Sequence, residues 1–161
     1  GDVTLVEFFD YNCGYCKRAL ASVAKLIEND PKLRVVLKDF AILGSDSVET
    51  AQVATAARLQ FTPQKFWDFH QKLLSTRGHI NKAQAMAVAK ELGADMTRLE
   101  QDIAKPETAA ALQEVNKVAQ ALGFDGTPAW VVGKEAFVGG LPHDELKTKI
   151  DNIRKCGKSE C

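Results

Sequence analysis

Two cysteines separated by two residues are the part of this sequence best suited to chemistry. Cys13 and Cys16 flank the dipeptide Gly14-Tyr15, and they follow an apolar run at residues 3–9. A helical pattern begins directly after them, at residues 19–27. A strand, a CxxC and a helix in this order are typical of a cysteine pair that performs thiol–disulfide exchange. The spacing therefore predicts a redox-active dithiol.

The expected position of Cys13 at a helix start would control its reactivity. Free backbone N–H groups and the positive end of the helix dipole both stabilise a thiolate at such a position. We expect the pKa of Cys13 to fall from about 8.5 into the range of roughly 3.5–7.5 found for such cysteines. Cys16 would lie one turn further on, shielded beneath Cys13. Cys13 is therefore the predicted nucleophile, and Cys16 would resolve the mixed disulfide that Cys13 forms.

A zinc site is the main competing interpretation of the CxxC. Cys156 and Cys161 could supply two further ligands, although zinc usually takes such pairs from compact loops. Here one pair opens a helix and the other ends the chain. An inert structural disulfide at the CxxC, and a peptide-binding or chaperone-like module without catalysis, also remain open.

The second cysteine pair is expected to be a local structural tie. Cys156 and Cys161 are five positions apart, and closing so short a loop stabilises a protein by about 2 kcal/mol. No helix start follows Cys156, so a second redox pair is the less favoured alternative.

Length and charge exclude several classes of protein. The chain has 161 residues, 45% of them hydrophobic, and 21 basic residues balance 21 acidic ones. These values indicate one soluble globular domain, and they give no sign of a nucleic-acid or membrane-surface partner. No apolar run reaches the roughly 18 residues of a membrane span. The chain begins almost directly in a strand, which we expect to reflect removal of an export signal.

The strand at residues 3–9 contains one carboxylate, Glu7, among apolar residues. A buried carboxylate titrates at raised pH or finds a partner, and Glu7 could relay the proton of Cys16. Residues 33–40 form a second predicted strand, where Lys38 is a candidate partner for Glu7. An edge position open to water for Glu7, and an exposed edge position for Lys38, are the alternatives.

Residues 47–105 show helical signals only. Thr62-Pro63, Asn81 and Asp95 are predicted helix starts. The aromatic residues at 66, 67 and 69 are expected to form the core of this region, and His70 and His79 to be surface or capping residues without metal-ligand spacing.

Strand signals return after a long helix that begins at Pro106 and ends at Gly123. Thr127-Pro128 leads into a strand and is a candidate cis bond. Gly133-Lys134 suits a two-residue hairpin turn, and Pro142 begins a last helix.

Two stretches resemble the DsbA-like branch of the thioredoxin superfamily, the bacterial periplasmic thiol–disulfide oxidoreductases. Residues 7–16 read EFFDYNCGYC, and residues 126–129 read GTPA. The resemblance implies an α/β, thioredoxin-like fold with an all-helical insert. The thioredoxin-like domain would be split between residues 1–46 and 106–161, and residues 47–105 would form the inserted subdomain.

The resemblance also implies roles for individual residues. Cys13 matches the nucleophile, Cys16 the resolving cysteine and Glu7 the buried acid, with Lys38 as its basic partner. The substrate groove would be formed by Gly14, Tyr15, Thr127, Pro128 and Trp130. The chemistry needs no cofactor. Unfolded or misoxidised proteins would be the substrates, and a membrane redox partner would reset the CxxC in the periplasm.

Two departures favour a subgroup of this family. Strongly oxidising DsbA enzymes carry Pro-His between the cysteines, whereas Gly14-Tyr15 and Thr127 resemble the DsbC isomerases and the ScsC proteins. The sequence therefore favours a disulfide isomerase or reductase over a dithiol oxidase. Some isomerases form homo-oligomers through an N-terminal segment that this sequence does not show.

Overall fold

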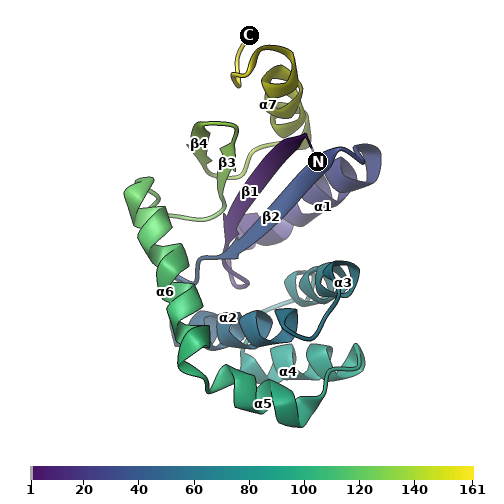
Figure 1. Ribbon diagram of the computed structural model, residues 1–161, viewed down its shortest axis with the longest axis vertical. Helices are drawn as coiled ribbons and strands as arrows, with labels where there is room; N and C mark the ends of the chain where they lie inside the picture. Colours follow the sequence, from purple (N-terminus) through teal and green to yellow (C-terminus); the bar gives the residue numbers. More distant parts are fainter. Residues whose placement is uncertain (1) are drawn as a thin grey trace.

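A four-stranded sheet forms the framework of the protein, which a computed structural model describes over residues 2–161 (Figure 1). Seven helices surround the sheet or extend beyond it. The elements follow in the order β1 (Val3–Phe9), α1 (Gly14–Asn29), β2 (Leu33–Asp39), α2 (Ser45–Arg58), α3 (Pro63–Leu74), α4 (Lys82–Glu91), α5 (Met96–Ile103), α6 (Pro106–Ala121), β3 (Ala129–Val132), β4 (Glu135–Val138) and α7 (His143–Cys156).

The strand that leads to the CxxC lies inside the sheet. The strand order is β2-β1-β3-β4, with β1 parallel to β2 and antiparallel to β3. The loop that follows β1 therefore starts from a strand held on both edges. This rigid support fixes the position of Cys13.

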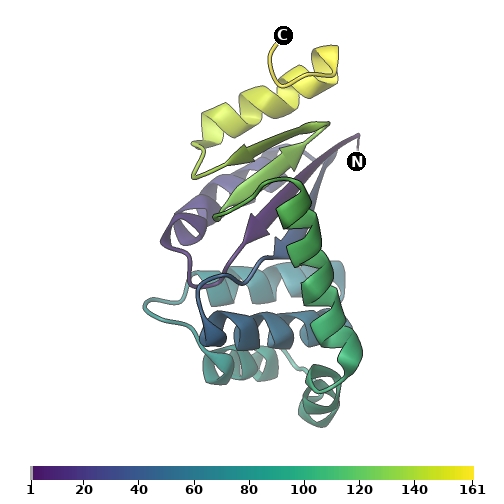
Figure 2. The ribbon, with the colours of Figure 1, turned by 90° about the vertical axis from the view of Figure 1, so that its left-hand side faces the viewer.

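Helices cover both faces of the sheet, and alternate residues of β1 contact different helices. Leu5 packs in one core with Val23 of α1 and Leu146 of α7. Phe8 faces the other way and packs with Ala119 of α6 and with Phe124. Figure 2 shows α6 on one side of the sheet and α1 with α7 on the other. This alternation decides which side chains of each strand can meet.

Helices α2 to α5 form the predicted all-helical insert. They lie beyond the end of β1 that leads to the CxxC (Figure 1). Phe9, the last residue of β1, and Tyr11 join the core of the insert, beside Phe69 and Leu73. The sheet and the insert thus share one apolar core directly under the CxxC.

The predicted helix starts in the insert are confirmed by their caps. The side chain of Thr62 accepts from Lys65 N, and that of Asp95 accepts from Arg98 N. Asn81 forms a reciprocal capping box with Gln84. Such caps satisfy backbone donors that would otherwise be free at a helix start. Within residues 2–161, no helix has the length and apolar character needed to cross a membrane.

Candidate active site

Cys13 occupies the position that precedes the first turn of α1. It is the N-cap residue, and its Sγ accepts a hydrogen bond from the backbone N–H of Cys16 at 3.1 Å. Both cysteines are free thiols in the structure. Cys13 keeps 5% of its surface exposed, whereas Cys16 has none. A reactant can therefore reach the sulfur of Cys13 and not that of Cys16.

The surroundings of the two thiols give them very different pKa values. A hydrogen bond from the Cys16 thiol, helped by the Cys16 backbone N–H, outweighs burial and lowers the pKa of Cys13 to about 6. Burial and the neighbouring Cys13 raise the pKa of Cys16 well above its ordinary value. At neutral pH the pair therefore holds one thiolate, on the accessible sulfur.

The loop before β3 brings a second motif to Cys13. The sulfur of Cys13 lies 3.4 Å from the carbonyl oxygen of Thr127, 114 positions away in the sequence. The Thr127–Pro128 peptide bond is cis. The carbonyl of Pro128 accepts from the backbone N–H of Gly139 at 2.8 Å, which attaches this loop to the residue after β4. The structure thus places the Thr-Pro motif beside the nucleophilic sulfur.

The dipeptide between the cysteines is exposed at the surface. Gly14 has no side chain, and Tyr15 is 62% exposed. The guanidinium of Arg18 lies 4.5 Å from the centre of the Tyr15 ring. Gly140 also adjoins the ring, since an added Cβ there would lie 3.4 Å from Tyr15 Cδ1. Tyr15 therefore presents an aromatic surface close to Cys13.

Trp130 does not contribute to a substrate groove, and this prediction is wrong. Its side chain is fully buried, and its indole N–H donates to the carbonyl of Gly139 at 2.8 Å. Trp130 is paired with Glu7 across β1 and β3, so its side chain lies on the face that α1 and α7 cover. Successive side chains of a strand point to opposite faces of the sheet, and the position of Trp130 in β3 places it on the covered face.

Glu7 is a buried carboxylic acid in the middle of the sheet. It is 2% exposed, and its Oε2 has no hydrogen-bond partner within residues 2–161. Burial, with the charge of Cys13 as a second cause, raises the pKa of Glu7 to about 8. The alternative of an edge position open to water is therefore wrong. A group that titrates near 8 can take up and release a proton at neutral pH.

The predicted pairing of Lys38 with Glu7 is not formed. In the parallel register Glu7 lies opposite Leu37, while Lys38 lies opposite Phe8. Neighbours in register point to the same face, so Lys38 points away from the face of Glu7. Lys38 is exposed at the edge strand β2, as the alternative interpretation expected.

Two polar residues before Cys13 attach the active-site loop to the rest of the protein, and sequence analysis missed both. The Asp10 carboxylate accepts from the backbone N–H groups of Asn12, Ile42 and Leu43 and from the Ser47 hydroxyl, at 2.7–3.0 Å. The Asn12 amide donates to the carbonyl of Ile80 and accepts from its N–H. The available signal was a run of turn-forming polar residues after a buried strand.

His70 lies in the core, so its prediction as a surface or capping residue is wrong. It is 1% exposed, and its Nδ1 shares a 3.0 Å hydrogen bond with the hydroxyl of buried Tyr11. Burial, with the charge of Arg58 as a second cause, lowers the pKa of His70 to about 3. A neutral His70 thus holds the insert to the residue two positions before Cys13. His79 is exposed and paired with Asp46 at 2.8 Å.

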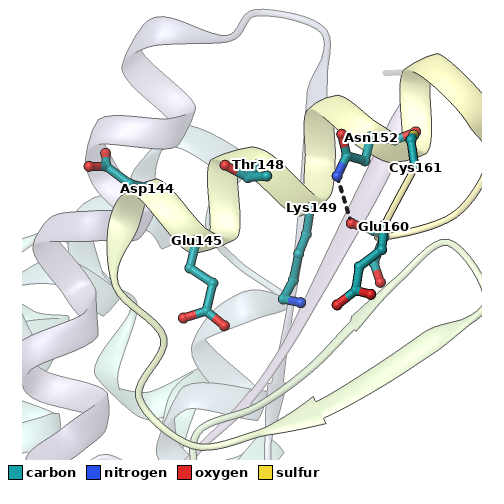
Figure 3. A pocket seen from close by; sticks show the side chains of 8 residues that line it. Asp144, Glu145, Thr148, Lys149, Asn152, Glu160 and Cys161 are labelled. Atoms are coloured by element: carbon teal, nitrogen blue, oxygen red, sulfur yellow. Dashed lines mark hydrogen bonds between the residues drawn. The ribbon is translucent and has the colours of Figure 1, made fainter.

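Cys156, the last residue of α7, forms a disulfide with Cys161. Both are exposed, and the tail between them is held by a bond from Ser159 N–H to the Glu135 carboxylate. Figure 3 shows the adjoining pocket of about 470 Å³ along α7, where Lys149 points into the same space as Glu145 and Glu160. The pocket contains no free thiol among residues 2–161. Within these residues there is also no group of three or more histidine, cysteine or acidic residues that could hold a metal ion.

The model of the DSBA-like thioredoxin domain family matches residues 4–151 of the chain. The chain belongs to this family. The match includes the CxxC, the helical insert, the Thr127-Pro128 loop and most of α7, so the α/β thioredoxin-like fold with a helical insert is confirmed. With its free CxxC at the start of α1, this domain has the features of a thiol–disulfide oxidoreductase.

Three solved structures show the extent of the similarity. A thioredoxin-like oxidoreductase from Silicibacter pomeroyi DSS-3 is 40% identical, with a TM-score of 0.89 over 97% of this chain and 88% of its own. The thiol-disulfide exchange protein alpha-DsbA2 from Wolbachia pipientis is 29% identical, with a TM-score of 0.87 over 95% and 82%. The catalytic domain of Proteus mirabilis ScsC is 26% identical, with a TM-score of 0.82 over 94% and 83%.

The chain is also similar to part of a longer protein. The Na(+)/H(+) antiporter NhaA 1 of Salinispora arenicola (strain CNS-205) is 30% identical over 149 residues, which are 92% of this chain. The chain spans 22% of the length of that antiporter.

Proposed function

We propose that this oxidoreductase acts on cysteines of unfolded or misoxidised proteins, chiefly as a disulfide isomerase or reductase. The observation that carries the proposal is the pairing of an accessible, acidic Cys13 with a fully buried Cys16. The exposed Tyr15 and Gly14, with the Thr127-Pro128 loop, would hold an extended substrate segment through loose contacts. Promiscuity toward substrates is the expected consequence.

In isomerisation, the Cys13 thiolate attacks one sulfur of a wrong disulfide. A bond forms between Cys13 and that sulfur, and the other substrate sulfur leaves as a thiolate. Attack by another substrate thiolate then forms the new substrate disulfide and returns the Cys13 thiolate. No electrons are gained or lost overall.

In reduction, Cys16 completes the reaction. It loses its proton and attacks the sulfur of Cys13, which releases the substrate thiolate and forms the Cys13–Cys16 disulfide. Two electrons pass from the pair to the substrate, and a redox partner must return them. We propose that Glu7, when ionised, receives the Cys16 proton, because burial and the raised pKa of Cys16 otherwise disfavour its thiolate.

The burial of Cys16 favours isomerisation over rapid release. A thiol with a strongly raised pKa contributes little thiolate, and only the thiolate attacks a disulfide. The mixed disulfide on Cys13 therefore persists long enough for the substrate to rearrange. Gly14-Tyr15 and the threonine before the cis-proline support the same assignment.

A dithiol oxidase is the second candidate. The hydrogen bonds that lower the pKa of Cys13 stabilise the reduced protein, and a stabilised reduced form makes the Cys13–Cys16 disulfide more oxidising.

A paired ribonuclease assay distinguishes these activities. We expect this chain to restore activity to scrambled, oxidised ribonuclease in a redox buffer, and the Cys13→Ser variant to restore none. Rapid oxidation of reduced ribonuclease without unscrambling would instead assign the protein as an oxidase.

We propose the periplasm as the working compartment. The C-terminal disulfide supports this proposal, because such bonds persist in oxidising compartments. A membrane redox partner would reset the CxxC there. We also propose that residues 47–105 are an inserted subdomain of a thioredoxin-like domain formed by residues 1–46 and 106–161.

A further inference from the structure

A groove of about 550 Å³ begins beside the nucleophile and runs between α1 and the loop after α3. We call it the cationic groove and define it by Gly14, Lys17, Arg18, Leu74, Arg77 and Gly78. No acidic residue lines this groove. The whole chain is electrically balanced, so three cations in a groove that begins at the residue after Cys13 are a local feature.

The three cations of the groove have no acidic partners. None of them forms an ion pair within the part of the chain that the structure describes. Arg154, in contrast, pairs with both Asp2 and Asp30. The free charges of the groove therefore remain available to an anionic ligand.

Two of the three cations are held in place by neutral groups. The Lys17 ammonium donates to the carbonyls of Thr76 and Gly78, at 3.0 and 2.7 Å, and so fixes the loop that carries Arg77. Arg18 stacks on the ring of Tyr15. These contacts restrict side-chain movement without neutralising charge, which lowers the entropy cost of binding an anion.

Gly14 leaves the guanidinium of Arg18 uncovered next to the cysteine. A Cβ at this position would lie 3.6 Å from Nη1 and 3.9 Å from Nη2 of Arg18. A longer side chain at position 14 would extend toward this charge, which the Tyr15 ring already adjoins at 4.5 Å. The glycine that follows Cys13 therefore lines the cationic groove and leaves this side of the Arg18 guanidinium open.

We propose that the cationic groove selects substrate segments that carry a glutamate or aspartate within a few residues of the reacting cysteine. The inference rests on the proposed function and adds a substrate preference to it. A carboxylate beside the cysteine would meet Arg18 and Arg77 while the sulfur reaches Cys13. Guanidinium groups suit this role because they bind carboxylates with two parallel hydrogen bonds.

The test measures mixed-disulfide formation by the Cys16→Ser variant, which keeps a hydroxyl beside Cys13. Three peptides of equal length carry one activated cysteine and differ in having glutamate, glutamine or lysine at the positions beside it. One exposed ion pair changes a rate by at most about fivefold, so two free arginines predict roughly a five- to tenfold advantage of the glutamate over the lysine peptide. Salt should reduce this ratio toward one.

Matched variants identify the cations that cause the preference for the glutamate peptide. Arg18→Gln with Arg77→Gln should bring the glutamate-to-lysine ratio close to one, and Arg77→Glu should lower or reverse it. Lys25→Gln is the control, because Lys25 is an exposed cation of α1 outside the groove. It should leave the ratio unchanged.

The possible outcomes separate the two proposals. Equal rates for the glutamate and lysine peptides at low salt would overturn the inference, and the oxidoreductase would stand if the glutamine peptide still forms its adduct. A ratio that persists in the double arginine variant would also overturn it. Failure of all three peptides to react would contradict the proposed function itself.

Discussion

Cys13 and Cys16 are held at the start of a helix inside the protein, whereas Cys156 and Cys161 close a short loop after the last helix. In the first pair, the sulfur of Cys13 accepts hydrogen bonds from the thiol and the backbone N–H of Cys16, and Cys16 is fully buried. In the second pair both residues are exposed and bonded to each other. Cysteine thus serves thiol–disulfide exchange in the first pair and attaches the C-terminal tail in the second.

The comparison shows that surroundings, and not spacing alone, determine what a cysteine pair does. Cys13 receives an N–H donor because it precedes α1, and it adjoins Thr127 because β3 pairs with β1. Cys161 is bonded to Cys156, and its sulfur lies 3.4 Å from the carbonyl oxygen of Asn152 in α7, with no helix start beside it within residues 2–161. The first environment stabilises a thiolate on Cys13, whereas the second holds a closed disulfide.

Removing Cys13 from the first pair, and both cysteines of the second pair, tests this contrast most strongly. Cys13→Ser should reduce turnover in the ribonuclease assay to the uncatalysed rate, because no other free thiol is accessible among residues 2–161. The double variant Cys156→Ser/Cys161→Ser should keep full turnover. Activity lost only in the double variant would reverse the assignment of the two pairs.

Removal of Cys16 should stop turnover and leave the substrate bound to Cys13 through a stable mixed disulfide. The Cys16→Ser variant can still form a disulfide between Cys13 and substrate, but it cannot resolve that bond. We expect stable adducts that mass spectrometry locates at Cys13. Adducts that form no more readily than in the unaltered protein would show that Cys16 is not the resolving residue.

Glu7→Gln should change how stability depends on pH. Burial raises the pKa of Glu7 to about 8 from an ordinary value of 4.5, so between these values the folded protein keeps a proton that the unfolded chain has lost. The free energy of unfolding therefore falls as pH rises through this window. Urea unfolding of the oxidised protein, whose thiols do not titrate, should give a flatter profile for Glu7→Gln.

The buried Asp39 adds a slope of the same sign in both proteins, because burial raises its pKa as well. The difference between the two profiles isolates Glu7. Parallel profiles would contradict the buried-acid account, and an unchanged rate of resolution in Glu7→Gln would remove Glu7 from the mechanism.

Removal of the Cys156–Cys161 disulfide should have the smallest effect, a modest decrease in the free energy of unfolding. Loss of a disulfide that closes so short a loop should lower the free energy of unfolding by at most about 2 kcal/mol. Ser159 and Asn152 keep the tail attached through hydrogen bonds, which reduces the loss further. Thermal unfolding of Cys156→Ser/Cys161→Ser measures it. Global unfolding of this variant would show that the pair supports much more than the tail.

Much of the fold was predictable because its signals are local. Apolar runs gave the strands, and caps such as Thr62 and Asn81 gave the helix starts. The CxxC before a helix, with Thr127-Pro128 before a strand, was sufficient to identify the centre of the site. These features depend on residues within one or two turns of each other.

The predictions that failed depend on which face a residue occupies. Lys38 was assigned as a cation of the second predicted strand, and Trp130 as a neighbour of Thr127-Pro128, but sheet register turns Lys38 away from Glu7 and buries Trp130. His70 has a polar side chain on a helix, and only the packing of α3 under Tyr11 buries it. The contacts of Asn12 reach the insert 68 positions away, and no local pattern predicts such a partner.

The most direct test of the account is the pH dependence of alkylation of the reduced protein. Iodoacetamide reacts with thiolates, so the rate at Cys13, identified by mass spectrometry, reports the pKa of that thiol. The structure predicts a midpoint at about 6, with Cys16 unmodified over the same range. A midpoint near the ordinary value of 9, or equal labelling of Cys13 and Cys16, would contradict the account.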